Sequence, residues 1–283
     1  MTFLTSTAGA SSILPPEFSS LITAPLEAQS VAFNPALATP VTTGSHEFHI
    51  PILKANAETI WVEETGELTP SEPTMGELTV VPSKTGGLVP VSREMANDSA
   101  PSSQEMIGKS LAADIVRNVD TAFLGNLASP APKGLASLPE ADADAWLNVA
   151  VVDTGAAITN LDPFNAALAA CESADGNITG WLMHPTDALA LANLKDATDS
   201  SKPLLENPRV IAGRPVIVSN KATPGVRWGL DAAAITTVLR EDVEIAISDA
   251  PFFTSDRIAI RSTLRVGFGF HTPNRLVKMY DKV

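Results

Sequence analysis

Few residues of this sequence have the types and spacing that catalysis or metal binding requires. His46 and His49 are three residues apart in a strand-like segment, which places their side chains on opposite faces and makes them a poor metal-ligand pair. The adjacent carboxylates of Glu63 and Glu64 are of the kind that a glycosidase uses, but they stand among prolines and glycines typical of an exposed turn. Cys171 falls on the apolar face of an expected helix, where a cysteine is usually a small buried hydrophobic residue.

Longer catalytic motifs are absent from the sequence. It contains no G-x-S-x-G, phosphate-binding glycine loop, H-E-x-x-H or paired C-x-x-C. We therefore predict that the protein is not an enzyme and has no catalytic, cofactor-binding or metal-binding residues. The remote alternative is a hydrolase that uses the turn carboxylates, which would be a monomer whose saccharide- or ester-cleaving activity is lost in Glu63→Gln.

The charge of the chain excludes several classes of partner. The formal net charge is −13 and the isoelectric point is near 4.7, whereas a nucleic-acid-binding surface needs clustered Lys and Arg. The first basic residue is Lys54, so the N-terminal region has neither a basic arm nor the charged start of a signal peptide. No apolar run approaches the ~20 residues of a membrane span. We expect a soluble, acidic protein made in the cytosol, with no membrane contact.

The strongest helix signal spans residues 103–124. Ser102 and Glu105 have the spacing of a capping box, and Gly125 suits the left-handed residue that often ends a helix. At 1.5 Å per residue the helix would be a rod of roughly 33 Å. One apolar stripe runs along it, formed by Ile107, Leu111, Ile115, Val119, Ala122 and Phe123. A sheet or a neighbouring element must cover this stripe, as in an ordinary α+β domain.

Residues 1–43 indicate an extended arm. Prolines interrupt any helix longer than a few turns, yet apolar residues such as Phe18, Leu21 and Phe33 stand between them. An arm of this kind is expected to lie on another surface, such as a neighbouring subunit. The alternative is a flexible terminus with one short amphipathic helix near residues 16–21.

Residues 44–91 have the pattern of a long β-hairpin. Alternating residues at 48–52 and the segment 59–62 predict the outgoing strand, and residues 78–91 predict the return strand. The tip between them is charged and contains Glu63, Glu64 and Glu67. A two-stranded excursion has little core of its own, so it is also expected to find a partner surface.

The rest of the chain predicts an α/β segment followed by long strands. Asp162-Pro163 starts one helix, residues 181–183 form a buried strand, a second helix follows to Leu194, and residues 216–218 form another strand. Residues 243–247 and 258–270 then alternate between apolar and other residues, most clearly in the second segment. In the second of these segments the apolar face would receive the stripe of the long helix. The opposite face would carry Arg257, Arg261 and Arg265.

The order of these elements resembles the major capsid protein of tailed bacteriophages with the Hong Kong 97 fold, over nearly the whole chain. The motifs that carry the resemblance are the turn V-S-R-E-M at 91–95, the long helix ending near Asp120 and Gly125, W-L-M-H-P-T at 181–186, L-K-D at 194–196, G-R-P-V at 213–216 and the long strands at 243–270.

The resemblance implies an α+β fold divided into six segments. These are an N-terminal arm at 1–43, an extended loop formed by the β-hairpin at 44–91, a peripheral domain with a long spine helix at 92–144, an axial α/β domain at 145–238, the long strands of the peripheral domain at 239–270, and a C-terminal strand at 271–283 that returns to the axial domain.

The resemblance also implies function. Copies of such a protein form hexamers and pentamers that tile an icosahedral shell around the double-stranded DNA genome, assembling in the bacterial host cytoplasm. The partners would be the protein itself, DNA through weak non-specific contact, and possible portal, scaffolding, protease and cementing or decoration proteins. An encapsulin-like nanocompartment shell shares the fold and is the alternative, distinguished by protein rather than DNA contents.

Specific inter-subunit contacts are expected at the arm and the hairpin. Glu63, Glu64 and Glu67 are predicted to approach Arg257, Arg261 and Arg265 of another subunit, and Phe18, Leu21 and Phe33 to lie on a neighbour. Some members of the family join subunits by a Lys–Asn isopeptide bond. Lys54 and Lys84 lie in the hairpin, but no asparagine occurs between Arg240 and Thr272, where the partner is expected. A self-catalysed crosslink is therefore not predicted.

Overall fold

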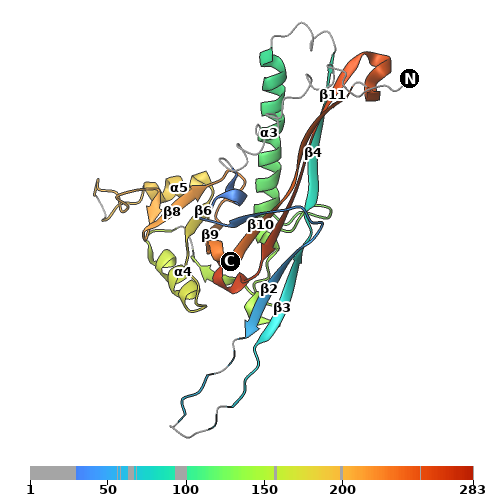
Figure 1. Ribbon diagram of the computed structural model, residues 1–283. Coiled ribbons are helices and arrows are strands. Elements are labelled where there is room, and N and C mark those ends of the chain that lie inside the picture. Colours follow the sequence, from blue (N-terminus) through green and yellow to red (C-terminus); the bar gives the residue numbers. More distant parts are fainter. Residues whose placement is uncertain are drawn as a thin grey trace.

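The computed structural model describes residues 30–282 apart from 56, 58, 63–66, 68, 93–100, 156–157, 198–199 and 249. The described chain forms a long sheet backed by one long helix, a second sheet with two short helices, and a two-stranded ribbon that projects from the molecule (Figure 1). The elements are therefore of the mixed α+β kind that the sequence predicts.

The long sheet has four strands. In spatial order they are β1 (Thr39–Thr43), β10 (Ile235–Ser248), β11 (Arg257–Phe270) and β4 (Ser83–Ser92). Strand β1 runs parallel to β10, and the other pairs are antiparallel. Strand β10 begins at Ile235, opposite Phe270, so the four residues before 239 also belong to this sheet.

The second sheet has six strands and packs with helices α4 (Asp162–Glu172) and α5 (Pro185–Ala192). Its spatial order is β5 (Ala150–Asp153), β12 (Val277–Tyr280), β9 (Arg227–Leu230), β6 (Gly180–Met183), β8 (Arg214–Val218) and β7 (Val210–Ile211). The C-terminal strand β12 thus lies between β5 and β9. Short 3-10 segments lie between the other elements: η2 (Val31–Phe33), η3 (Leu135–Ser137), η4 (Ala145–Leu147), η5 (Ala232–Ala234), η6 (Ala250–Ser255) and η7 (Pro273–Arg275).

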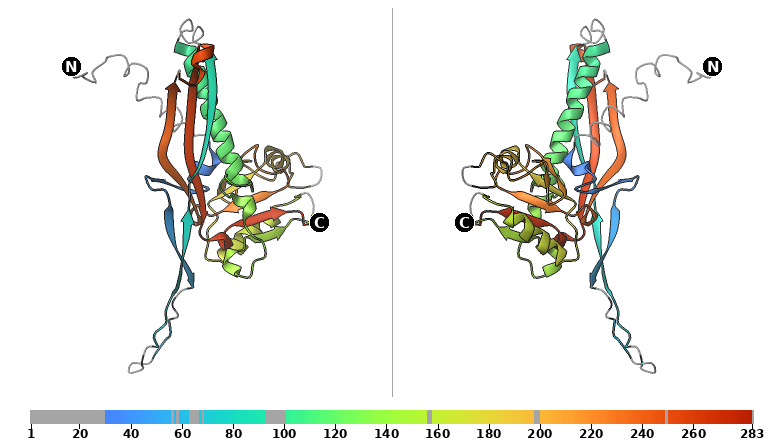
Figure 2. Two further views of the ribbon diagram at one scale, coloured as in Figure 1. Left: turned by 90° about the vertical axis from the view of Figure 1, so that its right-hand side faces the viewer. Right: turned by 90° about the vertical axis from the view of Figure 1, so that its left-hand side faces the viewer.

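The long helix, α3 (Pro101–Leu124), is confirmed at the predicted place, and it lies along the long sheet (Figure 2). Its buried stripe includes Ile115 and Val119. Phe123 meets Phe268 of β11 edge to face at 5.1 Å between ring centroids, and Phe270 at 6.3 Å. The apolar face of β11 therefore packs against the helix as predicted. The apolar stripe of α3 and the apolar side chains of β11 are both removed from water only when they face each other. The side chains of the predicted capping box, Ser102 and Glu105, lie outside the described residues.

The end of α3 differs from the prediction. Gly125 is not among the described glycines with a positive φ, and its N–H donates to the Thr121 carbonyl at 3.0 Å, continuing the helical pattern. The chain returns across this end at Gly134, where an added Cβ would stand 2.0 Å from the Ala122 oxygen and 2.4 Å from the Phe123 oxygen. The helix therefore ends without a left-handed cap, and Gly134 of the following segment packs against its last carbonyl groups.

The predicted return strand of the hairpin is two strands in the structure. Strand β3 (Thr74–Val80) pairs with β2 (Phe48–Ala55) in the ribbon, whereas β4 leaves the ribbon and pairs with β11 in the long sheet. The predicted strand at 59–62 is wrong, since the ladder between β2 and β3 ends at Ala55 and Thr74. Beyond that point the described residues project away from both sheets (Figures 1 and 2).

Small residues at the end of β11 allow the ribbon to lie on the sheet. A Cβ added at Gly267 would stand 2.7 Å from Val80, and one added at Gly269 would stand 2.9 Å from Ile50. These two ribbon residues therefore occupy the space that side chains at the glycines would fill. The alternation of glycine and phenylalanine thus serves both faces: Phe268 packs against α3, and the glycines admit the ribbon.

Residues 30–43, which the sequence predicts to be part of an arm, belong to the folded body. Phe33 and Leu37 are 4% and 0% exposed and lie in the same core cluster as α3 and β11. Buried Thr237 of β10 donates its hydroxyl to the Ala32 carbonyl at 2.7 Å, and Thr179 donates to the Ala36 carbonyl at 2.8 Å. Apolar burial and these hydrogen bonds hold the segment between the two sheets.

The helices and strands of the second sheet follow the sequence closely. Helix α4 begins at Asp162 with proline in its first turn, and Phe164 packs edge to face on Trp181 at 5.0 Å. Strand β6 is buried along its whole length. Gly213 turns the chain into β8 with φ of +74°, a conformation that favours glycine. Helix α5 ends at Ala192, two residues before the predicted end.

Candidate assembly surfaces

His49, one of the two histidines considered as metal ligands, makes other contacts. His49 faces Glu77 and Glu47 on the ribbon, with 3.7 Å between its Nε2 atom and the Glu47 carboxylate. Among the residues that the structure describes, no group of three or more His, Cys, Asp or Glu side chains is arranged to hold a metal ion. The ribbon histidine therefore takes part in an exposed cluster of polar contacts.

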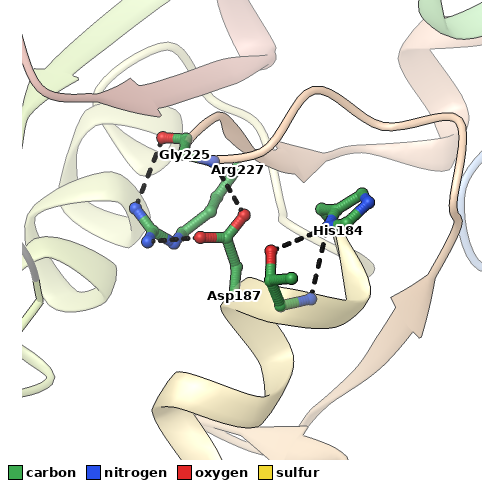
Figure 3. A network of polar contacts seen from close by, with 5 residues as sticks. His184, Asp187, Gly225 and Arg227 are labelled. Atoms are coloured by element: carbon green, nitrogen blue, oxygen red, sulfur yellow. Dashed lines mark hydrogen bonds and ion pairs between the residues drawn. The ribbon is translucent and has the colours of Figure 1, made fainter.

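The one place where His, Thr and Asp cluster within four residues is the start of α5 (Figure 3). His184 Nδ1 accepts the backbone N–H of Thr186 at 3.2 Å and so caps the helix. The Asp187 carboxylate is directed elsewhere: it accepts from Arg227 at 2.8 Å and from the Gly225 N–H at 2.9 Å. In a catalytic triad the histidine would accept a proton from a hydroxyl and donate a hydrogen bond to the carboxylate. Here His184 Nδ1 accepts a backbone N–H and Asp187 binds Arg227 and Gly225, so the cluster stabilises the fold.

The Asp187–Arg227 pair connects α5 to the first residue of β9. Each side chain is 9% exposed, and Arg227 Nη1 also donates to the Gly225 carbonyl at 3.4 Å. The Arg227 Nε atom is buried with no protein partner. The guanidinium therefore depends strongly on this carboxylate, because a buried charge is tolerated only when it is paired.

The predicted arginines lie on the face of β11 opposite α3. Arg257 and Arg261 are exposed and Arg265 is half-buried. In the strand register Arg265 stands between Arg240 of β10 and Lys84 of β4, so three cations follow one another across the sheet. Like charges in directly opposed positions repel, and Arg265 and Lys84 are such a pair.

Exposed apolar side chains gather where the ribbon ends. Trp61 is 104% exposed, and Ile60 and Val62 beside it are 48% and 42% exposed. Leu53 and Met75 on the adjoining strands are 53% and 73% exposed. Sequence reasoning missed this surface because it placed Trp61 in a strand. The available signal was an apolar triplet directly before a Pro- and Gly-containing charged turn.

The remaining predicted contact residues differ in where they lie. Phe18, Leu21, Glu63 and Glu64 lie outside the described residues, and Glu67 is exposed. Phe33 is buried within its own chain, so its side chain is not available to a neighbouring subunit in this conformation. Lys54, considered above for a crosslink, lies near the outer end of the β2–β3 ladder with its Nζ atom 5.2 Å from the centroid of the Trp146 ring.

A projecting ribbon, an exposed apolar tip and a basic sheet face suit a subunit that is completed by copies of itself. The model of the family described as "Phage capsid family" matches residues 10–281. The chain belongs to the phage capsid family. It is a structural major capsid protein of a tailed phage and a component of the virion, and neither a nanocompartment shell nor a hydrolase is favoured.

Solved capsid structures share the fold of this capsid protein. The capsid of an empty GTA particle has a TM-score of 0.75 at 18% identity, covering 100% of both chains. A chain from Mycobacterium phage Adephagia has a TM-score of 0.73 at 18% identity, covering 90% of this chain and 91% of that one. A chain from Microbacterium phage Oxtober96 has a TM-score of 0.72 at 17% identity, covering 89% and 91%. A comparison with curated proteins finds no match.

The expected α+β capsid fold is confirmed by these likenesses. None of the helices in the described part of the capsid protein is both long and apolar enough to cross a membrane. The boundaries predicted for the peripheral and axial domains remain predictions.

Cys171 of the capsid protein is expected to be unreactive in the folded subunit. Its side chain is fully buried, its Sγ donates to the Arg275 carbonyl at 3.1 Å, and burial, aided by Asp231, raises the pKa of the thiol to about 11. Alkylation needs the thiolate, which is scarce at pH 8 when the pKa is this high. Mass spectrometry should find iodoacetamide on Cys171 only after unfolding in urea. Stoichiometric labelling of the folded subunit at pH 8 would contradict this expectation.

Proposed function

We propose that this capsid protein assembles into hexamers and pentamers that tile an icosahedral shell around double-stranded DNA, with the ribbon tip of each copy lying on a neighbouring subunit. The observation that carries the proposal is the exposed tip, Ile60-Trp61-Val62, at the end of a ribbon that projects from the body. Apolar side chains concentrated at such a place lose their contact with water only when a partner covers them.

Electron microscopy of the purified protein tests the proposal. Closed isometric shells, or rings of five and six subunits, are expected. A protein that stays monomeric over a range of salt and protein concentration would contradict it.

Because the net charge is −13, contact with packaged DNA is proposed to be weak and non-specific. Assembly is proposed to occur in the host cytoplasm.

We further propose that the acidic residues that follow this tip, Glu63, Glu64 and Glu67, face the basic sheet face of another subunit. That face carries the arginines of β11 and Lys84 of β4. The cations Arg265 and Lys84 lie directly opposite each other on neighbouring strands, and Glu67 is exposed. Glu63 and Glu64, outside the described residues, add two further charges of the same sign. An exposed ion pair contributes only about 0.2–1 kcal/mol, but a shell repeats it in every copy.

Replacing Glu63, Glu64 and Glu67 together by lysine should weaken or block shell assembly, because three cations would then meet a basic surface. The replacement Glu63→Gln, Glu64→Gln and Glu67→Gln is the matched control, since it removes charge without reversing it. We expect the lysine variant to give the fewest closed particles by electron microscopy and the glutamine variant an intermediate number. Particles of normal yield from the lysine variant would remove the charge pairing from the proposal.

A further inference from the structure

One carboxylate of α3 holds the first described residues of the chain. Asp120 is 7% exposed, and its Oδ1 atom accepts the Ser30 hydroxyl at 2.6 Å and the Val31 N–H at 2.9 Å. The partners are 90 and 89 residues away in the sequence. Two hydrogen bonds to consecutive residues define both the position and the direction of the backbone at that point.

Asp120 is buried, so its negative charge depends on the hydrogen-bond donors around it. Burial raises the pKa of this carboxyl group, while the hydrogen bonds from Ser30 and from the backbone of Ala32 and Val31, and the charge of Lys221, act in the opposite direction. A buried carboxylate that lost its donors would carry a large desolvation penalty. The carboxylate and the start of the folded segment therefore satisfy each other.

The hydrogen bonds farther along the segment have a different role. Thr237 holds the Ala32 carbonyl and Thr179 holds the Ala36 carbonyl, while Phe33 and Leu37 are buried in the core. Among the side-chain hydrogen bonds of the described residues, those to Asp120 are the ones nearest the N-terminus of this segment. Without Asp120 the segment from Ala32 onward would keep these hydrogen bonds, whereas Ser30 and Val31 would lose theirs to the carboxylate and keep the burial of their side chains.

We propose that Asp120 is a positioning residue that sets the direction of the backbone at Ser30 and Val31, where residues 1–29 join the folded body. The proposal rests on the proposed function, in which copies of the protein contact one another in a shell, and the partner it proposes for this part of the chain is a second copy of the same chain. Through Asp120, the orientation of α3 and the direction of the backbone at Ser30 and Val31 are linked within each subunit.

Hydrogen exchange in the isolated subunit tests the anchor directly. In Asp120→Leu, which is similar in size but lacks an acceptor, exchange of the Val31 amide should be roughly tenfold faster or more. In Asp120→Asn, which keeps a side-chain oxygen, exchange should stay closer to that of the natural protein. Asp114→Leu is the matched control, because Asp114 is an exposed residue on the same helix and should leave this amide unchanged.

Assembly gives the second measurement. Asp120→Leu should lower the yield of closed shells or broaden their size in electron micrographs, whereas Asp120→Asn and Asp114→Leu should not. Unchanged exchange at Val31 in Asp120→Leu overturns the proposal. Normal shells from a subunit with fast Val31 exchange overturn it as well, because they would show that the placement of the arm does not matter for assembly.

Two further variants separate the possible failures. If Asp120→Leu does not fold, Ser30→Ala removes one of the two donors, and unchanged exchange of the Val31 amide in that variant overturns the proposal. A subunit lacking residues 2–29 tests whether the arm contributes to assembly. Normal shells from the shortened subunit would refute an assembly role for the arm, while the exchange result at Asp120 would still stand as a measurement of the anchor.

Discussion

Replacing Trp61 with serine is expected to abolish or strongly reduce shell assembly while leaving the isolated subunit folded. The side chain is 104% exposed, so its loss removes no packing within the chain. In an interface, a tryptophan that becomes covered typically contributes at least about 2 kcal/mol, and losing that much weakens one contact roughly thirtyfold. Every subunit of a shell would lose the same contact, so the losses accumulate over the particle.

The measurement is the yield of closed particles, together with circular dichroism and thermal unfolding of the unassembled subunit. Trp61→Phe is the control, because it keeps an aromatic ring in the same place and should retain most of the assembly. If Trp61→Ser forms particles at the normal yield, the tip is not an assembly contact. If its unassembled subunit unfolds at a lower temperature, Trp61 has a role within the chain that its exposure does not reveal.

Breaking the Asp187–Arg227 pair should have the largest effect on the stability of the subunit itself. Asp187→Ala leaves the guanidinium of Arg227 buried without its carboxylate, and removing one partner of such a pair typically costs about 3–5 kcal/mol. The change also removes the acceptor of the Gly225 N–H. Urea unfolding of the unassembled subunit should show this loss as a lower midpoint.

Two variants show whether burial is the cause. Asp114→Ala breaks an exposed pair with Arg117, whose side chains are 60% and 54% exposed, and should cost less than about 1 kcal/mol. The double variant Asp187→Leu with Arg227→Met should recover much of the lost stability, because apolar residues can replace a buried ion pair. The explanation would be wrong if Asp187→Ala cost no more than Asp114→Ala.

Several elements were predictable because their signals are local. The apolar stripe of α3 repeats at helical spacing, so both its place and the face that it buries follow from residues 101–124. Asp162 and the proline after it start α4, and the apolar run of β6 marks a strand buried on both faces. Alternation along β11 likewise indicates which side of that strand meets the helix.

Other features depend on partners that are distant in the sequence. The residues from 78 to 91 have strand character throughout, but only the tertiary structure divides them between the ribbon and the long sheet. Phe33 stands among the prolines that suggested an arm, and its burial depends on a space between the two sheets that no local pattern describes. Trp61 lacks a pairing strand for the same kind of reason: the register of β2 with β3 ends before it.

By itself, the sequence of this capsid protein determined the helices α3, α4 and α5 and the strands with a clear apolar pattern, such as β6 and β11, because side-chain periodicity and helix-start residues act within a few positions of one another. Only the tertiary structure decided which polar groups are paired. Asp120 meets Ser30 across 90 residues and Asp187 meets Arg227 across 40. Such contacts form because the packing of apolar faces brings these groups together, and once buried they must satisfy each other.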